Sequence, residues 1–463
     1  MLQQVQNNVA VVIGGSMAGL LTARVLSNHF RQVILLERDK INDQPEARKG
    51  QPQTRHLHAL LTKGLETMLT YFPTLVDDLT DGGAIISDIG QTLRWHAFGG
   101  YRRQFPSGMM GALMSRPFLE WQIRRQVLAL PNVQLIDTCA VEGLVWSPDH
   151  SQVTGVTIQH RNGDQGATTL IADLVVDASG RGSASPKWLA EGGYAKPTEN
   201  FVKVNVGYAT RTYRRKPGDL EGAELLIIAS APPHGKRTGL LLPMEGDRWG
   251  CTLGGWSGDH PPTDEAGFMA FAQSLPAPDI YTILKRLEPI SEIIPHKFPG
   301  SLRRHYEGLK RFPEGYLVLG DAICSFNPVY GQGMTSATLQ AAALDRLLTD
   351  RAVLTGLWRD FFKAAAQVVE IPWQSAVGED FRYPETEGKK PVGVDLLNAY
   401  VTKVHQATHV DTTVYMAFLK VINLMATPTS LFHPKIVWRV LWGKPHAQVK
   451  TPMGKPELVY SGD

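Results

Sequence analysis

The stretch VVIGGSMAGL, residues 11–20, decides the fold class of this 463-residue chain. Branched apolar residues over 9–13 predict a buried strand that runs straight into GGSMAG, residues 14–19, and a helical pattern follows over 17–28. This is the G-x-G-x-x-G arrangement of a dinucleotide-binding turn, except that Ser16 stands where the second glycine normally lies. Such a turn lets the backbone approach a pyrophosphate at the positive end of a helix, and a serine is small enough to be accommodated there.

A second predicted strand, residues 32–36, ends at Glu37. An acidic residue at this place after the glycine turn binds the ribose hydroxyls of a dinucleotide, and a carboxylate favours an unphosphorylated ribose. NAD and FAD share both features, so they do not decide between the two cofactors. The alternative interpretation is a tight strand–helix turn with no ligand.

Composition excludes several classes of protein. The chain is 43% hydrophobic and 20% charged, with a net charge of +3, and its basic pairs are scattered, so we expect no nucleic-acid binding. The three cysteines are far apart, which argues against a disulfide framework or a cysteine-ligated metal and fits a reducing cytoplasm. Polar residues 1–8 predict no signal peptide, and the apolar stretch 414–426 is too short and too polar to cross a bilayer. We therefore predict a cytoplasmic protein.

The order of elements predicts an interrupted α/β module. Strands and helices alternate up to about residue 185, extended segments dominate 185–310, and a strand and a helix return over 315–348. The part from 357 to 445 has a mostly helical pattern. A hairpin is expected over 239–255, turning at Glu245-Gly246-Asp247.

Two further stretches carry chemistry. VVDASGRGS, residues 175–183, is a buried strand followed by a glycine-containing loop, and LVLGDAICSFNPVYGQGMTSA, residues 317–337, is a strand, a carboxylate and a glycine-opened helix. A carboxylate beside the positive end of a helix can hold a polyol chain and an anionic ring edge.

With KGQPQTRHLHALL (49–61) and SRPFLEW (115–121), these stretches resemble the single-component flavoprotein monooxygenases of the p-hydroxybenzoate hydroxylase and squalene epoxidase type. The sequence is most similar to the bacterial polyether epoxidases of the lasalocid and monensin type. The resemblance covers most of the first 345 residues. It implies an α/β fold with a Rossmann-like FAD-binding domain, a β-rich substrate domain and a helical C-terminal region. The FAD-binding domain is expected at 1–80, 110–185 and 310–350. The substrate domain is expected at 81–109 and 186–309, and the helical C-terminal region at 351–463.

The resemblance also implies the residues that hold non-covalent FAD. The pyrophosphate loop is formed by Gly14, Gly15, Ser16, Met17, Ala18 and Gly19, with Glu37 and Arg38 at the adenosine ribose and Val141 beside the adenine. Arg116 reaches toward the phosphates and ribityl chain, Asp321 binds the ribityl chain, and Arg55 lies near the cofactor or the channel of a mobile flavin. Gly331 belongs to the cofactor-binding loop that opens the last helix of this domain, and the amides of Gly333 and Met334 face the flavin N1–C2 edge.

The alternative interpretations of these side chains are ordinary ones. In the alternative interpretation, Asp321 caps the turn that follows it, and Arg116 pairs with a surface carboxylate. His56 and His58 are packing or capping residues rather than ligands of one metal, because two positions apart on a helix they point apart. No metal is expected.

FAD does not by itself choose a reaction. The absence of a second glycine-loop unit disfavours enzymes with two dinucleotide domains, and no W-x-W-x-I-P or Y-x-W-x-F-P motif is present. The resemblance implies insertion of one oxygen atom from O2, through a flavin C4a-hydroperoxide, into a lipophilic alkene or aromatic substrate, with epoxidation in a biosynthetic pathway preferred. NAD(P)H is the expected electron donor, directly or through a reductase.

Such chemistry needs a dry cavity. The expected walls are Trp95, Phe98, Val204, Val206, Leu240, Leu242, Trp249 and Trp256. The sequence identifies no catalytic side chain. Two alternatives stay open: an FAD-dependent dehydrogenase or double-bond reductase on the same fold, and a non-catalytic flavin-binding scaffold. The expected partner is a lipophilic small molecule. Peripheral contact of the protein with a membrane surface is compatible with such a substrate.

Overall fold

The computed structural model describes residues 9–58, 60–161 and 166–443. The segment 1–8, for which the sequence predicts no signal peptide, lies outside the described residues, and so does the end of the helical region beyond 443. Within the described parts of the chain, no helix is both long enough and apolar enough to cross a membrane.

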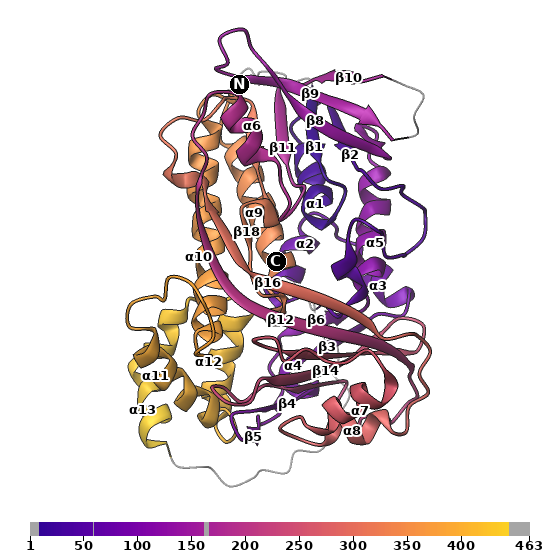
Figure 1. Cartoon of the computed structure of the whole chain (residues 1–463), viewed down its shortest axis with the longest axis vertical. Helices are drawn as coiled ribbons and strands as arrows, with labels where there is room; N and C mark the ends of the chain where they lie inside the picture. Colours follow the sequence, from indigo (N-terminus) through magenta and orange to yellow (C-terminus); the bar gives the residue numbers. More distant parts are fainter. Residues whose placement is uncertain (1–8, 59, 162–165, 444–463) are drawn as a thin grey trace.

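A five-stranded parallel sheet lies at the centre of the upper half of the molecule as drawn in Figure 1. Its order is β17 (Tyr316–Val318), β11 (Leu174–Asp177), β1 (Val9–Ile13), β2 (Gln32–Leu36) and β7 (Val133–Ile136). β1, β2, β11 and β17 are almost completely buried, as expected for a parallel sheet covered on both faces, whereas the edge strand β7 is only half-buried.

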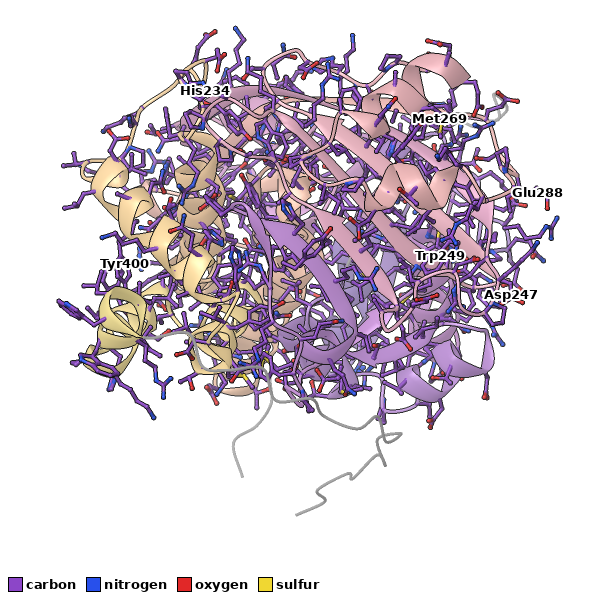
Figure 2. The ribbon with its side chains drawn as sticks, turned by 90° about the horizontal axis from the view of Figure 1, so that it is seen from below. His234, Asp247, Trp249, Met269, Glu288 and Tyr400 are labelled. Atoms are coloured by element: carbon purple, nitrogen blue, oxygen red, sulfur yellow. The ribbon has the colours of Figure 1, made fainter. Side chains whose placement is uncertain are left out.

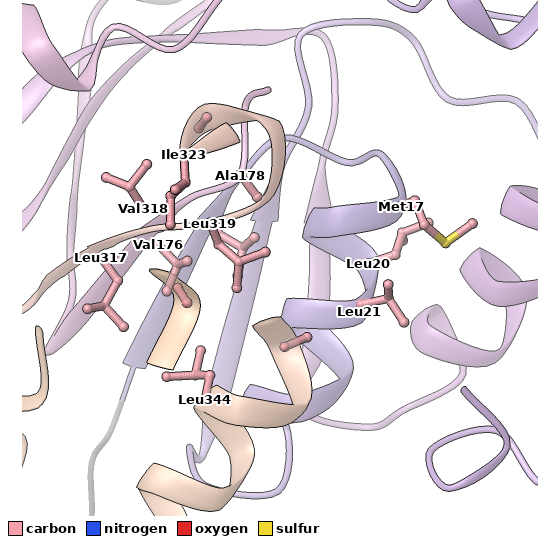
Figure 3. Close-up of a cluster of buried hydrophobic side chains, with 14 of the residues drawn as sticks. Met17, Leu20, Leu21, Val176, Ala178, Leu317, Val318, Leu319, Ile323 and Leu344 are labelled. Atoms are coloured by element: carbon pink, nitrogen blue, oxygen red, sulfur yellow. The ribbon is translucent and has the colours of Figure 1, made fainter. Parts of the chain in front are cut away.

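Helices and a small sheet cover the two faces of the parallel sheet. α1 (Met17–Leu26) packs against α5 (Arg116–Leu128) and α9 (Gly333–Thr349), and Figure 3 shows apolar side chains of α1 and α9 with those of β11 and β17. An antiparallel sheet of β10 (Thr168–Ile171), β9 (Val153–His160) and β8 (Cys139–Trp146) contacts β11 and β2. The apolar residues over 169–176, whose sequence pattern predicts one strand, form two strands in two sheets, β10 and β11.

An eight-stranded sheet forms the second large sheet of the molecule. Its order is β18 (Cys324–Ser325), β16 (Ile294–His305), β12 (Thr198–Arg214), β15 (Arg248–Gly255), β14 (Arg237–Met244), β13 (Leu225–Ile228), β4 (Leu93–Ala97) and β5 (Gly100–Tyr101). The predicted hairpin is confirmed as β14 and β15, with positive φ at Gly246 and Asp247. Strand β4 pairs parallel to β13, so the later part of the insert expected at 81–109 joins this sheet, whereas its first strand, β3 (Ile85–Asp88), pairs with β6 (Met110–Leu113) in a separate two-stranded sheet.

One face of this sheet is covered by α7 (Glu265–Gln273) and α8 (Asp279–Leu284). The sequence analysis did not predict these two helices, because both lie within residues 185–310, which it predicted as extended. Met269 of α7 and Trp249 of β15, labelled in Figure 2, belong to this side. We call it the outer face of the sheet, and the opposite side, which carries Leu240 and Leu242, the inner face.

The C-terminal region is helical, as predicted. α10 (Leu357–Asp380) packs along α9, and α11 (Val394–Ala407), α12 (Thr412–Ile422) and α13 (Pro434–Trp442) form a group at the far end of α10 (Figure 1). The helix predicted at about 57–70 begins later, as α2, after a short 3₁₀ turn. The remaining elements are α2 (Thr62–Leu69), α3 (Leu75–Asp81), α4 (Ile89–Thr92) and α6 (Ser185–Glu191).

Candidate functional site

The turn between β1 and α1 is built for close backbone approach. Gly14 has φ +104°, and a Cβ there would lie 2.7 Å from the carbonyl oxygen of Ala178. A Cβ on Gly19 would lie 1.7 Å from the carbonyl oxygen of Gly14, so α1 can start this close to the strand only with glycine at both positions. Met17 is buried under this turn in the main core (Figure 3).

Glu37, at the end of β2, is tied to the same turn. Its Oε2 accepts a hydrogen bond from the Gly15 amide at 2.9 Å, and its Oε1 accepts one from the Asp39 amide at 2.9 Å. The Arg48 guanidinium lies 2.9 Å from Glu37 and 2.5 Å from Glu120. Burial opposes the Arg48 cation, but the two carboxylates outweigh burial and raise its pKa. These buried charges therefore compensate one another.

Arg116 connects this charge group to the rest of the site. It is the first residue of α5, buried, and its Nη2 lies 3.3 Å from Ser16 Oγ and 3.4 Å from Glu120 Oε2. Its positive charge also acts on Asp321 and His58, whose pKa values it lowers. Arg116 thus lies between the glycine turn and the loop after β17.

Asp321 lies in that loop, where Gly320 has φ +71° and a Cβ at Gly320 would come within 2.9 Å of the Ala18 side chain. The Asp321 side chain is exposed, yet desolvation raises its pKa against the opposing charges of Arg116 and Arg181. The Asp321 carboxyl is therefore accessible, although protein surrounds it closely enough for burial to act on its charge.

The start of α9 is open in the same way. Gly331 has φ +67°, Gln332 makes no side-chain cap, and a Cβ on Gly333 would meet no atom within 4 Å. The Met334 side chain is buried in the main core. The first amides of this long helix therefore face free space at the positive end of its dipole.

Within the described residues, no hydrogen bond or ion pair joins three predicted site residues to the glycine turn, Arg116 or Asp321. Arg38 is exposed and donates to the Gly50 carbonyl at 2.9 Å. Arg55 ends the 3₁₀ turn before α2 and is exposed. Val141 lies half-buried in β8, at a bulge where the strand pairs with β9.

The expected pocket walls separate into different environments. Leu240, Leu242 and Trp95 lie on the inner face, Trp95 also packs against α12, and Phe98 stacks on His405 of α11. Val204, Val206 and Trp256 are buried in the main core. Trp249 lies on the outer face, because successive side chains of β15 alternate, so the expectation that it shares a wall with Leu242 is corrected.

Polar side chains occupy much of the inner face, which the sequence analysis did not predict. His56 Nδ1 lies 2.7 Å from Thr210 Oγ1, which lies 2.6 Å from Thr252 Oγ1. The His296 ring is 5.2 Å from the His56 ring. Burial lowers the pKa of His56 to about 4, helped by the charges of His296 and Arg55, so this imidazole is neutral at pH 7.

A second buried polar network lies behind the turn that precedes α9. Asp380, the last residue of α10, is completely buried, and its Oδ1 accepts hydrogen bonds from Asn327 Nδ2 at 2.9 Å, Tyr330 hydroxyl at 3.0 Å and Trp256 Nε1 at 3.4 Å. The Tyr208 hydroxyl donates to Asn327 Oδ1 at 2.9 Å. Burial raises the pKa of Asp380 to about 7 although the three donors oppose it.

Sequence reasoning missed Arg48, Glu120 and Asp380. Glu120 follows Arg116 by four residues on one predicted helix, which is the spacing of an ion pair, so it was detectable. Arg48 and Asp380 reach the site only through the fold, and their local sequence carries no signal.

The comparisons with known proteins agree with this geometry. No family model matches the chain. Protein Rv3254 of Mycobacterium tuberculosis is 35% identical over 385 residues, which cover 80% of this chain and 80% of Rv3254. The chain belongs to the Rv3254 family. A kynurenine 3-monooxygenase of Salinispora tropica is 25% identical to this Rv3254-family protein over 372 residues, covering 74% of the chain and 73% of the relative.

Solved structures share the fold of the Rv3254-family protein at low sequence identity. The flavin-dependent brominase Bmp2 has a TM-score of 0.65 at 12% identity, covering 93% of this chain and 96% of Bmp2. The p-nitrophenol 4-monooxygenase PnpA of Pseudomonas putida gives 0.62 at 15%, covering 90% and 99%. A flavoprotein/dehydrogenase of Cytophaga hutchinsonii gives 0.64 at 15%, covering 89% and 92%. The predicted α/β fold of flavin-dependent monooxygenases, with its helical C-terminal region, is confirmed.

Proposed function

We propose that this protein is an FAD-dependent monooxygenase that transfers one oxygen atom from O2 to a lipophilic alkene or aromatic substrate, with an epoxidation of the polyether type as first choice. The observation that carries the proposal is the meeting of the β1–α1 glycine turn, Arg116 and Asp321 in the fold of flavin-dependent monooxygenases.

The residues of this chain fit a flavin dinucleotide on three counts. Gly14 and Gly19 leave the backbone of the turn bare. Arg116 Nε is buried and has no hydrogen-bond partner among the described residues, so it is available to a phosphate. The Asp321 carboxyl is accessible although protein surrounds it closely, so it can accept hydrogen bonds from the hydroxyls of a ribityl chain.

Each residue then has a definite task. The amides at the start of α1 would donate to the pyrophosphate, and Glu37 would accept from the adenosine ribose with the lone pairs that Gly15, Asp39 and Arg48 leave free. The amides of Gly333 and Met334 would face the ring edge that gains negative charge on reduction. When bound and reduced by NAD(P)H, directly or through a reductase, the flavin supplies the electrons that activate O2.

The inner face of the eight-stranded sheet is proposed to hold the substrate. Leu57, Leu240 and Leu242 give it apolar area that excludes water. Neutral His56 and the hydroxyl of Thr210 add hydrogen-bonding groups beside this area. A substrate with a mainly apolar body and a few polar groups fits this combination best.

Isotope labelling tests the reaction class. Purified protein should be yellow and should release FAD on acid precipitation, because no residue motif for covalent attachment is present. Under ¹⁸O2, one heavy oxygen atom should enter the product of a lipophilic alkene, and under H2¹⁸O with ordinary O2 none should enter at the oxidation step. A colourless protein that takes up no FAD, or an unlabelled product, contradicts the proposal.

The Cytophaga hutchinsonii neighbour favours a second candidate, a dehydrogenase or double-bond reductase. That reaction changes the product mass by two hydrogen atoms and transfers no label from O2. A protein that binds FAD and converts no substrate would instead be a flavin-binding scaffold.

A further inference from the structure

Apolar side chains are exposed along one edge of the C-terminal helices. The exposed fraction is 105% for Val392, 80% for Leu396, 66% for Trp442 and 60% for Trp438. We call the apolar edge the set Val392, Leu396, Leu397, Phe432, Trp438 and Trp442, all of which are exposed. Single exposed apolar residues are ordinary, but two tryptophans among six neighbouring apolar positions indicate a contact surface.

The residues of the apolar edge belong to two packed helices, α11 and α13, and to the segments that precede them. Helices α11 and α13 pack against each other and lie side by side at the outer corner of the molecule (Figure 1). Tyr400 of α11, labelled in Figure 2, stacks on Phe432 with ring centres 4.8 Å apart and donates to the Leu431 carbonyl at 2.7 Å. On α13, Lys435, Trp438 and Trp442 follow one another at helical spacing and form an exposed stripe.

The chain segment that carries the apolar edge is basic. Residues 389–443 contain six lysines and arginines and two aspartates, while the whole chain has a net charge of only +3. Lys390 and Arg439 are paired with the two aspartates. The other four lysines, which have exposed side chains and no ion pair within the described residues, are Lys389, Lys403, Lys420 and Lys435.

This combination favours one occupant. We propose that the apolar edge, with its lysines, docks the protein on the surface of an anionic lipid bilayer. Tryptophans suit the boundary between headgroups and acyl chains, and lysines beside them suit anionic headgroups. Helix α13, of nine residues, lies on such a surface and is too short to cross it.

Charge argues against a second copy of the chain as the occupant. A two-fold interface would place the same patch on both sides, so the lysines of one copy would face those of the other. Like charges across an interface disfavour association, whereas an anionic surface compensates all of them.

Vesicle flotation of the full-length protein tests the proposal, and it does not depend on the reaction. The probes are vesicles of phosphatidylcholine alone and of phosphatidylcholine with an equal amount of phosphatidylglycerol. We expect the protein to float with the anionic vesicles and to be released by high salt. The double substitution Trp438→Ser and Trp442→Ser should lower the bound fraction roughly tenfold.

Ile171→Ser is the matched control, because Ile171 on β10 is also an exposed apolar residue and lies outside the apolar edge. It should float like the unsubstituted protein. Circular dichroism checks the fold of each variant, and Lys403→Ser with Lys435→Ser provides a second variant, which should weaken binding to anionic vesicles. Absence of flotation, or equal flotation of the tryptophan variant, overturns the proposal. A dimer in solution that the tryptophan substitutions split would assign the face to a second copy and also overturn it.

Discussion

Replacing Asp380 by asparagine should remove a pH dependence of stability. Burial raises the pKa of this carboxyl from an ordinary 3.8 to about 7, so the folded protein holds a proton that the unfolded chain has already lost above pH 5. Protonated Asp380 therefore contributes fully to the free energy of unfolding below pH 4, and this contribution is lost as pH rises through 7. Asparagine is of the same shape, stays neutral, and keeps an oxygen for Asn327, Tyr330 and Trp256.

The magnitude follows from the two pKa values. Between pH 5 and pH 8, the free energy of unfolding of the unsubstituted protein should fall by about 3 kcal/mol relative to Asp380→Asn. Urea denaturation followed by circular dichroism at several pH values measures this difference. Asp395→Asn is the matched control, because Asp395 is an exposed carboxylate on α11 paired with Lys390. If the Asp380→Asn protein keeps the pH dependence of the unsubstituted one, the reasoning about this network is refuted.

Three further substitutions test the candidate cofactor site. Gly14→Val should abolish FAD binding, measured by flavin absorbance of the purified protein, because a Cβ there lies 2.7 Å from a carbonyl oxygen; a yellow variant would contradict this. Asp321→Ala should weaken FAD binding at least tenfold in fluorescence titration, since a hydrogen bond to a charged group contributes about 1.5–3 kcal/mol, and unchanged affinity would place the ribityl chain elsewhere. Arg48→Gln should lower the thermal midpoint, because it leaves buried Glu37 without a cation and Glu120 with Arg116 alone, whereas exposed Arg38→Gln should not; equal midpoints would mean that the charge group is solvated.

The sequence predicted the parts of the fold whose residues are contiguous. The turn at Gly14, the carboxylate of Glu37 and the hairpin at Gly246 all have a local signature, and the structure places them as expected. Helices α7 and α8 were missed because short apolar segments have no reliable period.

The candidate site could be predicted only in part for a similar reason. Arg48 meets Glu120 across 72 residues, and Asp380 meets Asn327 across 53, so only the folded chain brings them together. The face on which Trp249 lies was not predictable either, because the sequence shows alternation along β15 but not which set of side chains α7 and α8 cover.

The strand order of the parallel sheet has a consequence for the biogenesis of the protein. Its edge strand β17 comes from residues 316–318, while its neighbours β11 and β1 come from residues 174–177 and 9–13. During synthesis the ribosome must therefore release more than two thirds of the polypeptide before this sheet can be completed. A gene fragment that ends before β17 would leave the edge of β11 open to association with other chains, so neither half of the protein is expected to be expressed alone as a stable unit.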